Sequence, residues 1–374
     1  MLRRNFLKRS AAAGLGVNLP LSIDFAQTGA SLAQDKVYIP APSPAQRAWM
    51  DMRFGMFIHF GINTYYDREW SDGTLNPQGF NPGELDTDQW CRTAKAAGMK
   101  YVVITVKHHD GFCLWPSKYT DYSVASTPFK KDVLAMLVES THKYGLRLGW
   151  YYSLWDEHEP SYKRDWWKYI DFMKHQLEEL LTQYGDITEL WFDGFWKKQK
   201  TGWSKKTDLE GEADFQKKLL ERDRAFIDAW RLEGAYWWNM DHLYQFIKSI
   251  QPDCMVMNNS TSAYPAVPLH PVDIRSGEKY ITVKNDQKTW NWLGEEIYLP
   301  LQIETTMSVK GNEKFPTGNW FWHEWDTSVR PKKEIVELLK VADKMDANLL
   351  LNVGVSSEGK LRPVDENTLM SLQE

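Results

Sequence analysis

From about residue 54 the chain alternates between short apolar runs and longer segments whose apolar residues recur every three or four positions. The apolar runs are rich in β-branched and aromatic residues and predict strands at 56–61, 101–108, 147–153, 187–194, 254–259, 272–278, 301–308 and 349–354. The periodic segments predict helices at 86–98, 132–145, 239–252 and 332–345, and a long helix that Gly185 closes.

Strands that are apolar throughout and separated by helices indicate a parallel sheet buried on both faces. Eight such strands favour a closed (β/α)₈ barrel of the TIM type over residues 34–374, with an irregular second half where the helices are short or missing. An open doubly wound sheet is the alternative, but no G-x-G-x-x-G follows the first strand. A polar, charged insertion is expected at about 197–235.

The first 33 residues differ in character from the rest. Arg3 and Arg4 precede the tripeptide 6–8, Phe-Leu-Lys, and a stretch of small apolar residues, and Ser31 and Ala33 provide small side chains for cleavage. This arrangement resembles a twin-arginine export signal, so residues 1–33 are expected to be removed and the mature protein to be periplasmic or secreted from a bacterium. No later stretch is long and apolar enough to predict a membrane span.

Composition narrows the class of partner. The formal net charge of −5 argues against a nucleic-acid partner, which would need a basic face. Three cysteines without a C-x-x-C pair predict neither a disulfide framework nor a zinc site. Aromatic residues make up 14% of the chain, and such rings serve either cores or the stacking of sugars.

The predicted strands share a feature at their carboxyl ends, where the chemistry of a barrel is found. Each delivers a polar group where an apolar residue could stand, and together these groups predict a lined pocket: His59, His108-His109-Asp110, Tyr152-Ser153, Asp193, Asn258-Asn259, Arg275 with Glu278, Glu304 and Asn352.

Two kinds of chemistry fit such a pocket. A metal site could use the histidines and Asp193, but the H-x-H spacing that places two rings on one strand face is absent. Glycoside hydrolysis needs two carboxylates, one that donates a proton and one that attacks or stabilises the anomeric carbon. Asp193 with Glu278 or Glu304 could supply this pair.

Several motifs carry a family resemblance. The stretches 54–61 (FGMFIHFG), 96–123 with its KHHDGFCLW, 149–153 (GWYYS), 189–194 (ELWFDG) and 348–354 (NLLLNVG) resemble the α-L-fucosidases of glycoside hydrolase family 29. The resemblance implies a retaining exo-glycosidase without cofactor, which hydrolyses terminal α-L-fucosyl linkages of oligosaccharides or polysaccharides. It does not indicate the oligomeric state or the linkage.

The resemblance also implies roles for individual residues. Asp193, in the LWFDG motif, would be the nucleophile, and Glu278 is preferred over Glu304 as the acid/base, with Glu304 as a supporting pocket residue. The sugar-binding set would be His59, Glu69, Trp70, His108, His109, Arg275 and one of Tyr151 and Tyr152, of which Tyr152 is chosen because it lies nearer the strand end.

Two departures from the family pattern leave alternatives open. Many members have Asn-Asp-Arg-Trp where this chain has Asn258-Asn259-Ser260, so that an arginine is missing unless Arg275 replaces it. Most relatives also continue after the eighth strand into a β-sandwich, which is expected to be lacking here. A glycosidase for a related sugar, such as an α-L-galactoside or a modified fucoside, and a non-catalytic carbohydrate-binding barrel are therefore the competing interpretations.

Overall fold

The computed structural model describes residues 40–195, 234–259, 271–279, 286–292, 294–310 and 318–373, all within the compact unit Pro40–Glu374. The predicted export signal at 1–33 and nearly all of the predicted insertion lie outside these residues.

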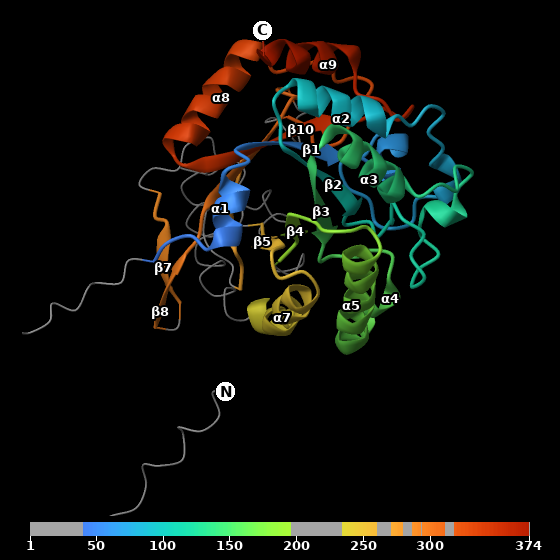
Figure 1. The fold of residues 1–374 in the computed structure, drawn as a ribbon. Helices are drawn as coiled ribbons and strands as arrows, with labels where there is room; N and C mark the ends of the chain where they lie inside the picture. Colours follow the sequence, from blue (N-terminus) through green and yellow to red (C-terminus); the bar gives the residue numbers. More distant parts are fainter. Residues whose placement is uncertain are drawn as a thin grey trace, which may run out of the picture. The chain divides into compact units, whose positions relative to one another are not determined.

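Eight parallel strands close into a barrel in the order β1-β10-β9-β6-β5-β4-β3-β2 (Figure 1). The barrel is the fold that the sequence predicts, and the open doubly wound sheet is excluded. Every strand lies at a predicted position: β1 Phe54–His59, β2 Tyr101–Lys107, β3 Arg147–Ser153, β4 Glu189–Asp193, β5 Met255–Asn258, β6 Ile274–Glu278, β9 Leu301–Thr306 and β10 Ala347–Gly354.

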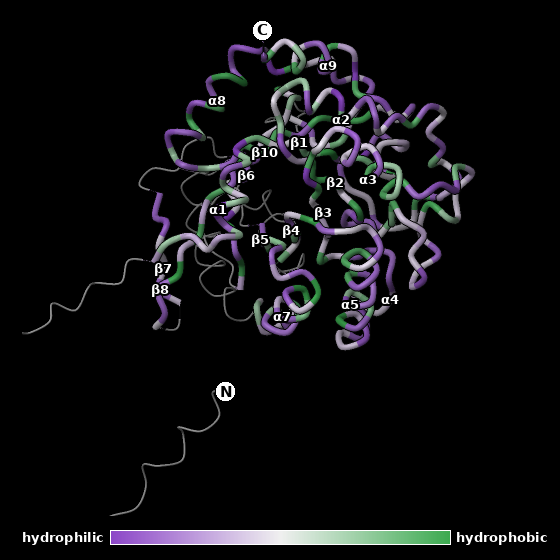
Figure 2. Tube along the Cα trace, in the orientation of Figure 1, coloured by the Kyte–Doolittle hydropathy of each residue, from purple (hydrophilic) through white to green (hydrophobic). Residues whose placement is uncertain are grey.

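Helices surround the ring of strands on its outer side (Figure 1). The predicted ones are α2 Thr87–Ala96, α3 Val133–Tyr144, α5 Trp166–Thr182, α7 Met240–Ile250 and α8 Lys332–Lys344, and each connects two neighbouring strands of the barrel. The sequence pattern does not predict α1 Pro44–Met50, α4 Pro160–Arg164 or α9 Pro363–Met370, which are short. Figure 2 shows hydrophobic residues concentrated in the strands, as both of their faces are covered.

The connection from β6 to β9 contains a hairpin. Strands β7 Thr289–Trp292 and β8 Glu295–Tyr298 pair with each other in antiparallel fashion and form a separate two-stranded sheet. This is the part of the chain where the sequence predicts an irregular second half, because no amphipathic helical pattern is present there.

Side chains of the strands alternate between two cores, one inside the barrel and one between barrel and helices. The inner core contains Phe57, Tyr101, Tyr151, Trp191 and Ile274, among others. The outer core contains the residues of opposite parity together with the inner faces of the helices. The parity of a residue in its strand therefore decides whether it can reach a site inside the barrel.

Helix α1 closes the amino-terminal end of the barrel. A capping box between Ser43 and Gln46 begins the helix, and it places Trp49 at the barrel floor. The indole Nε1 of Trp49 donates a 2.9 Å hydrogen bond to Glu189 Oε2, which also accepts one of 2.9 Å from Gln302 Nε2. Glu189 is thus a fully buried carboxyl group with two neutral donors, and it forms no ion pair with any of the described residues.

The floor carboxyl group predicts a pH-dependent stability. Burial raises the pKa of Glu189 from 4.5 to about 7. Between these values the folded protein retains a proton that the unfolded chain has lost, so the free energy of unfolding falls as pH rises from about 4.5 to about 7. This decrease in the free energy of unfolding amounts to roughly 3 kcal/mol at most. Glu189→Gln keeps an acceptor for both donors but cannot titrate, so the decrease should be absent in this variant.

Urea unfolding of both proteins at pH 5 and pH 8 measures this difference. Asp186→Asn, an exposed change before the same strand, serves as control. If the free energy of unfolding falls by the same amount from pH 5 to pH 8 in Glu189→Gln and in the unchanged protein, Glu189 is not the source of the pH dependence.

Within the described part of the chain, no helix combines the length and apolar character needed to cross a membrane.

Candidate active site

Asp193 is the last residue of β4 and points into the barrel mouth, with the same parity as Glu189 and Trp191. Its Oδ2 accepts a 2.6 Å hydrogen bond from the Tyr151 hydroxyl and lies 3.3 Å from His109 Nε2. Its Oδ1 accepts hydrogen bonds from the Gly194 backbone N–H at 2.8 Å and from Asn259 Nδ2 at 3.1 Å. Both carboxylate oxygens are therefore held by two donors each.

These contacts keep Asp193 ionised. Burial alone would raise its pKa, but the hydrogen bonds from His109, Tyr151 and Asn259 outweigh burial and lower the pKa from 3.8 to about 2. A buried carboxylate that stays charged and faces a pocket is suited to attack an electrophilic carbon or to stabilise a positive charge.

Gly194 allows this arrangement. Its φ of +80° lies in the left-handed region, and a Cβ atom there would lie 2.8 Å from the indole ring of Trp155. The Trp155 ring packs in turn against the imidazole of His109, with a centroid distance of 4.7 Å. The Asp-Gly dipeptide is thus required by the pocket wall.

A second carboxyl group shares a donor with Asp193. Asn259 Nδ2 donates to Glu278 Oε2 at 2.7 Å as well as to Asp193 Oδ1. Because both oxygens contact one nitrogen, they can be no more than about 6 Å apart, near the roughly 5–5.5 Å separation of retaining glycosidases.

The two carboxyl groups differ in their protonation. Burial raises the pKa of Glu278, and the nearby negative charge of Asp193 raises it further. One group ionised and the other inclined to hold its proton is the division of roles that glycoside hydrolysis requires.

Glu304 is fully buried, more so than Glu278. The two are paired in register on the adjacent strands β6 and β9, and Glu304 Oε2 accepts a 3.0 Å hydrogen bond from the Gly277 backbone N–H. Burial, together with the charges of Glu278 and Glu189, raises its pKa well above the ordinary value. Glu304 thus supports the strand end beside Glu278.

Three histidines meet at the strand ends, as the sequence predicts. The ring of His108 stacks on Tyr151 with a centroid distance of 5.6 Å, and its centroid lies 4.3 Å from that of His109 and 6.0 Å from that of His59. Because β2 ends at Lys107, both neighbouring rings can turn to the same pocket.

Hydrogen bonds fix the tautomers of two of these rings. His59 Nδ1 lies 2.7 Å from Asn352 Oδ1, whose amide is oriented by its own donation to the Trp320 carbonyl. Burial lowers the pKa of His59 to about 3, so the ring is neutral and Nδ1 carries the proton. His59 Nε2 is then a free lone pair that can accept a hydrogen bond from a ligand hydroxyl group. In His109, Nε2 faces Asp193 and Nδ1 lies 2.6 Å from the Ser153 hydroxyl.

Glu69 holds part of the pocket rim. Its carboxylate accepts hydrogen bonds from the backbone N–H groups of Trp320 and Phe321 at 3.1 and 3.0 Å, and it lies 2.9 Å from His323 Nε2. The Trp320 and Phe321 rings pack against His59, with centroid distances of 5.0 and 5.5 Å. Glu69 therefore shapes the pocket through these rings, and direct sugar binding by it stays a prediction.

Trp70 lies beside His109. The centroids of its ring and of the His109 ring are 6.5 Å apart, and the ring is partly exposed. A partly exposed indole beside a polar pocket offers an apolar face to a sugar, which is consistent with the predicted role.

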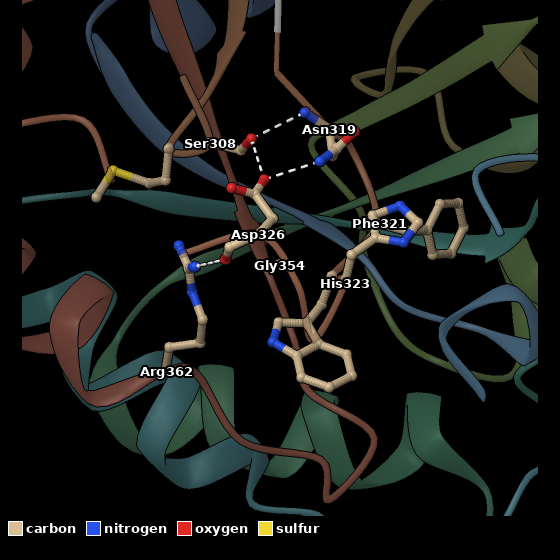
Figure 3. Close-up of a pocket in the computed structure, with 9 residues that line it drawn as sticks. Ser308, Asn319, Phe321, His323, Asp326, Gly354 and Arg362 are labelled. Atoms are coloured by element: carbon tan, nitrogen blue, oxygen red, sulfur yellow. Dashed lines mark hydrogen bonds between the residues drawn. The ribbon is translucent and has the colours of Figure 1, made fainter. Parts of the chain in front are cut away.

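A small pocket adjoins this rim at the ends of β9 and β10 (Figure 3). Asp326 lines this pocket, and its carboxylate accepts hydrogen bonds from the Ser308 hydroxyl at 2.6 Å and from Asn319 Nδ2 at 2.8 Å. The Arg362 guanidinium donates to the Asp326 carbonyl, as Figure 3 shows. Neither Asp193 nor Glu278 lines this pocket, and its bonds fix the segment that carries Trp320 and Phe321.

Two of the predicted binding residues point away from the barrel mouth and need correction. Tyr152 has the opposite parity to Tyr151, and its hydroxyl contacts Lys107 Nζ at 3.0 Å and Gln176 Oε1 at 2.7 Å in the outer layer. The tyrosine at Asp193 is therefore Tyr151.

Arg275 is the second correction. Ile274 lies in the inner core, so the side chain of Arg275 is on the outer face of β6. Its guanidinium bonds to Asp286 at 2.7 Å and to the Leu299 carbonyl at 3.0 Å, and it lies over the ring of Trp290. Arg275 ties the hairpin connection to the barrel wall and does not replace an arginine in the pocket.

Tyr151 and Asn259 are the site residues that the sequence analysis passed over. Asn259 is among the polar residues at the predicted strand ends and Tyr151 is the alternative to Tyr152, and the signal that identifies both is whether their side chains share the inward face with Asp193 and Glu278. Among the described side chains, no group of three or more His, Cys, Asp or Glu has the arrangement of a metal site.

A parallel eight-stranded barrel with two unlike carboxyl groups at its strand ends defines a protein of the glycoside hydrolase class. A family model described as Alpha-L-fucosidase matches residues 26–374. The chain belongs to this alpha-L-fucosidase family.

Individual relatives agree with this assignment. Alpha-L-fucosidase 1 of Arabidopsis thaliana is 30% identical over 354 residues, covering 90% of this chain and 60% of the relative. A putative alpha-L-fucosidase 1 of Oryza sativa subsp. japonica is 45% identical over 186 residues, 48% of this chain and 36% of the relative. The chain thus spans less than two thirds of the length of these relatives.

Solved structures give the same result. A glycoside hydrolase 29 family member from an unknown rumen bacterium matches with a TM-score of 0.69 and 28% identity, over 89% of this chain and 56% of that chain.

Proposed function

We propose that the protein is a retaining exo-α-L-fucosidase that hydrolyses terminal α-L-fucosyl linkages of oligosaccharides or polysaccharides. The observation that carries the proposal is the pair of Asp193 and Glu278, two buried carboxyl groups that share the Asn259 amide and whose pKa values are shifted in opposite directions. The names of the relatives support fucose as the sugar.

The geometry suggests a double displacement. Asp193 attacks the anomeric carbon and forms a bond to it, while Glu278 gives its proton to the glycosidic oxygen, which leaves with the electron pair of the broken C–O bond. Glu278, now a carboxylate, then removes a proton from water, which displaces Asp193 and restores both groups. In this proposal the neutral His59 and the Trp70 ring bind the sugar, which the lowered pKa of His59 and the position of Trp70 beside His109 support.

Product stereochemistry tests this proposal. Hydrolysis of 4-nitrophenyl α-L-fucopyranoside in the presence of methanol, followed by proton NMR, should yield methyl α-L-fucoside and α-L-fucose as first products. First formation of the β anomer would refute the two-step mechanism. A folded protein that cleaves an aryl α-L-galactoside faster than the fucoside would refute the choice of sugar.

We also propose export by a twin-arginine route, because Arg3 and Arg4 precede Phe-Leu-Lys and an apolar stretch. Fusion of residues 1–33 to a reporter that is active only after folded export tests this, with Lys at both arginines as the matched control. Equal export of both fusions would refute it.

A further inference from the structure

Asn259 stands between the two carboxyl groups and uses both hydrogens of its amide nitrogen. One is donated to Asp193 Oδ1 at 3.1 Å and the other to Glu278 Oε2 at 2.7 Å. The side chain is buried, so water does not compete for these bonds. A single amide therefore couples the two groups on which the proposed reaction depends.

Hydrogen bonds to the side-chain oxygen and to the backbone of Asn259 fix the orientation of this amide. The Ser276 hydroxyl lies 2.9 Å from Asn259 Oδ1 and 3.3 Å from Glu304 Oε2, and the shorter of these contacts lets it donate to the amide oxygen. The Asn259 backbone N–H donates to the carbonyl of Phe192, the residue before Asp193, at 2.8 Å. A flipped amide would turn its oxygen toward two carboxyl groups and lose all three side-chain bonds, so one orientation is selected.

The bond to Glu278 distinguishes the two oxygens of that carboxyl group. Oε2 accepts a hydrogen from Asn259, and the described residues give Oε1 no hydrogen-bond partner. When Glu278 is protonated, a proton on Oε2 would oppose the donated hydrogen, whereas a proton on Oε1 would not.

We propose that Asn259 is a positioning residue that holds Asp193 and Glu278 at a fixed separation and assigns the transferable proton of Glu278 to Oε1. This inference rests on the proposed function, because it concerns the same reaction. Asn259 itself exchanges no proton and forms no covalent bond.

A measurable consequence follows from the direction of these hydrogen bonds. A donor stabilises the ionised form of a carboxyl group, so loss of Asn259 should raise the pKa of both groups, each by about one unit. The other titratable groups that face Glu278 are Tyr151, His109, Lys279 and Glu304, and the substitution leaves them in place.

The test compares Asn259→Ala with Asn258→Ala in the full chain. Asn258 is the preceding amide, equally buried, and lies beside Arg275 on the outer face of the barrel wall. The Glu278 carboxyl group is followed by ¹³C NMR in protein labelled at the glutamate side chains, with Glu278→Gln to identify its signal. The same variants provide pH profiles of kcat/KM for 4-nitrophenyl α-L-fucopyranoside.

In Asn259→Ala we expect the Glu278 titration and the basic limb of the profile to move about one unit to higher pH, while Asn258→Ala leaves both in place. Ser276→Ala, which frees the amide without removing it, should give a smaller shift in the same direction. This variant also serves if Asn259→Ala does not fold.

An unchanged Glu278 titration in Asn259→Ala and Ser276→Ala, or an equal shift in Asn258→Ala, would overturn the inference. The proposed function fails separately. If the variants show the expected NMR shifts but the unchanged protein cleaves no fucoside, Asn259 bridges the two carboxyl groups as inferred and the protein catalyses a different reaction.

Discussion

Alanine in place of Asp193 is expected to lower kcat/KM for 4-nitrophenyl α-L-fucopyranoside by about 10⁴-fold or more, because the proposed mechanism forms its covalent intermediate on this carboxylate. Burial and four donors aim this carboxylate, and water cannot take its place in the same geometry. Nitrophenol release over time measures the effect.

Rescue of the variant by azide would show that the lost activity is that of the nucleophile. In Asp193→Ala the space left by the carboxylate admits azide to the face opposite the leaving group, so the rescued product should be β-L-fucosyl azide, inverted relative to the substrate. Asp186→Ala, an exposed acid before the same strand, should keep the activity of the unchanged protein. Substantial turnover by Asp193→Ala without azide would exclude this residue as the nucleophile.

The second large effect concerns the acid. Glu278→Ala should lower kcat/KM by about 10²- to 10⁴-fold for a fucoside with a poor leaving group and much less for a nitrophenyl fucoside, because a good leaving group needs no proton. A series of aryl fucosides of rising phenol pKa measures this dependence. Azide should restore turnover with α-L-fucosyl azide as product, since it attacks an intermediate already formed on Asp193.

Glu304 is the other candidate for the acid, and the sequence alone could not decide between it and Glu278. The side chain is fully buried and holds the Gly277 N–H, so Glu304→Gln should reduce activity to a similar degree for good and poor leaving groups. If Glu304→Gln instead shows the leaving-group dependence and Glu278→Ala does not, the acid is Glu304.

Periodicity was sufficient to predict the barrel. Each apolar run became a barrel strand, because strands buried on both faces must be apolar throughout. The hairpin β7–β8 was not predicted as strands, since its residues are mostly exposed or half-buried and carry no strong alternation. Helix α1 is a short plug whose burial depends on the finished barrel floor.

The same double burial explains the errors at the site. In a strand that is apolar on both faces, hydropathy does not say which face lies inside, and Tyr151 and Tyr152 look alike. Proximity to the strand end favoured Tyr152, whereas parity with Ser153 and the inner core selects Tyr151. For Arg275, the neighbouring Glu278 has the opposite parity, which already excludes a shared pocket.

Contacts between residues far apart in the chain could not be predicted from the sequence for another reason. Glu69 was expected at the sugar, yet its partners are Trp320, Phe321 and His323, far along the chain and without any motif that links them to it. Asn259 was noticed at a strand end, but its role depends on the meeting of three strands.

Closure of the barrel through β1 and β10 has a consequence for biosynthesis. Phe54 pairs with Leu349, so the apolar edge of β1 has no partner on that side until the ribosome has synthesised the chain as far as Leu349. At about 5–20 residues per second, this edge stays open for tens of seconds, a period in which strand edges are prone to aggregate. A nascent chain of this protein should therefore depend on a chaperone until β10 arrives, and premature termination before β10 should yield insoluble protein.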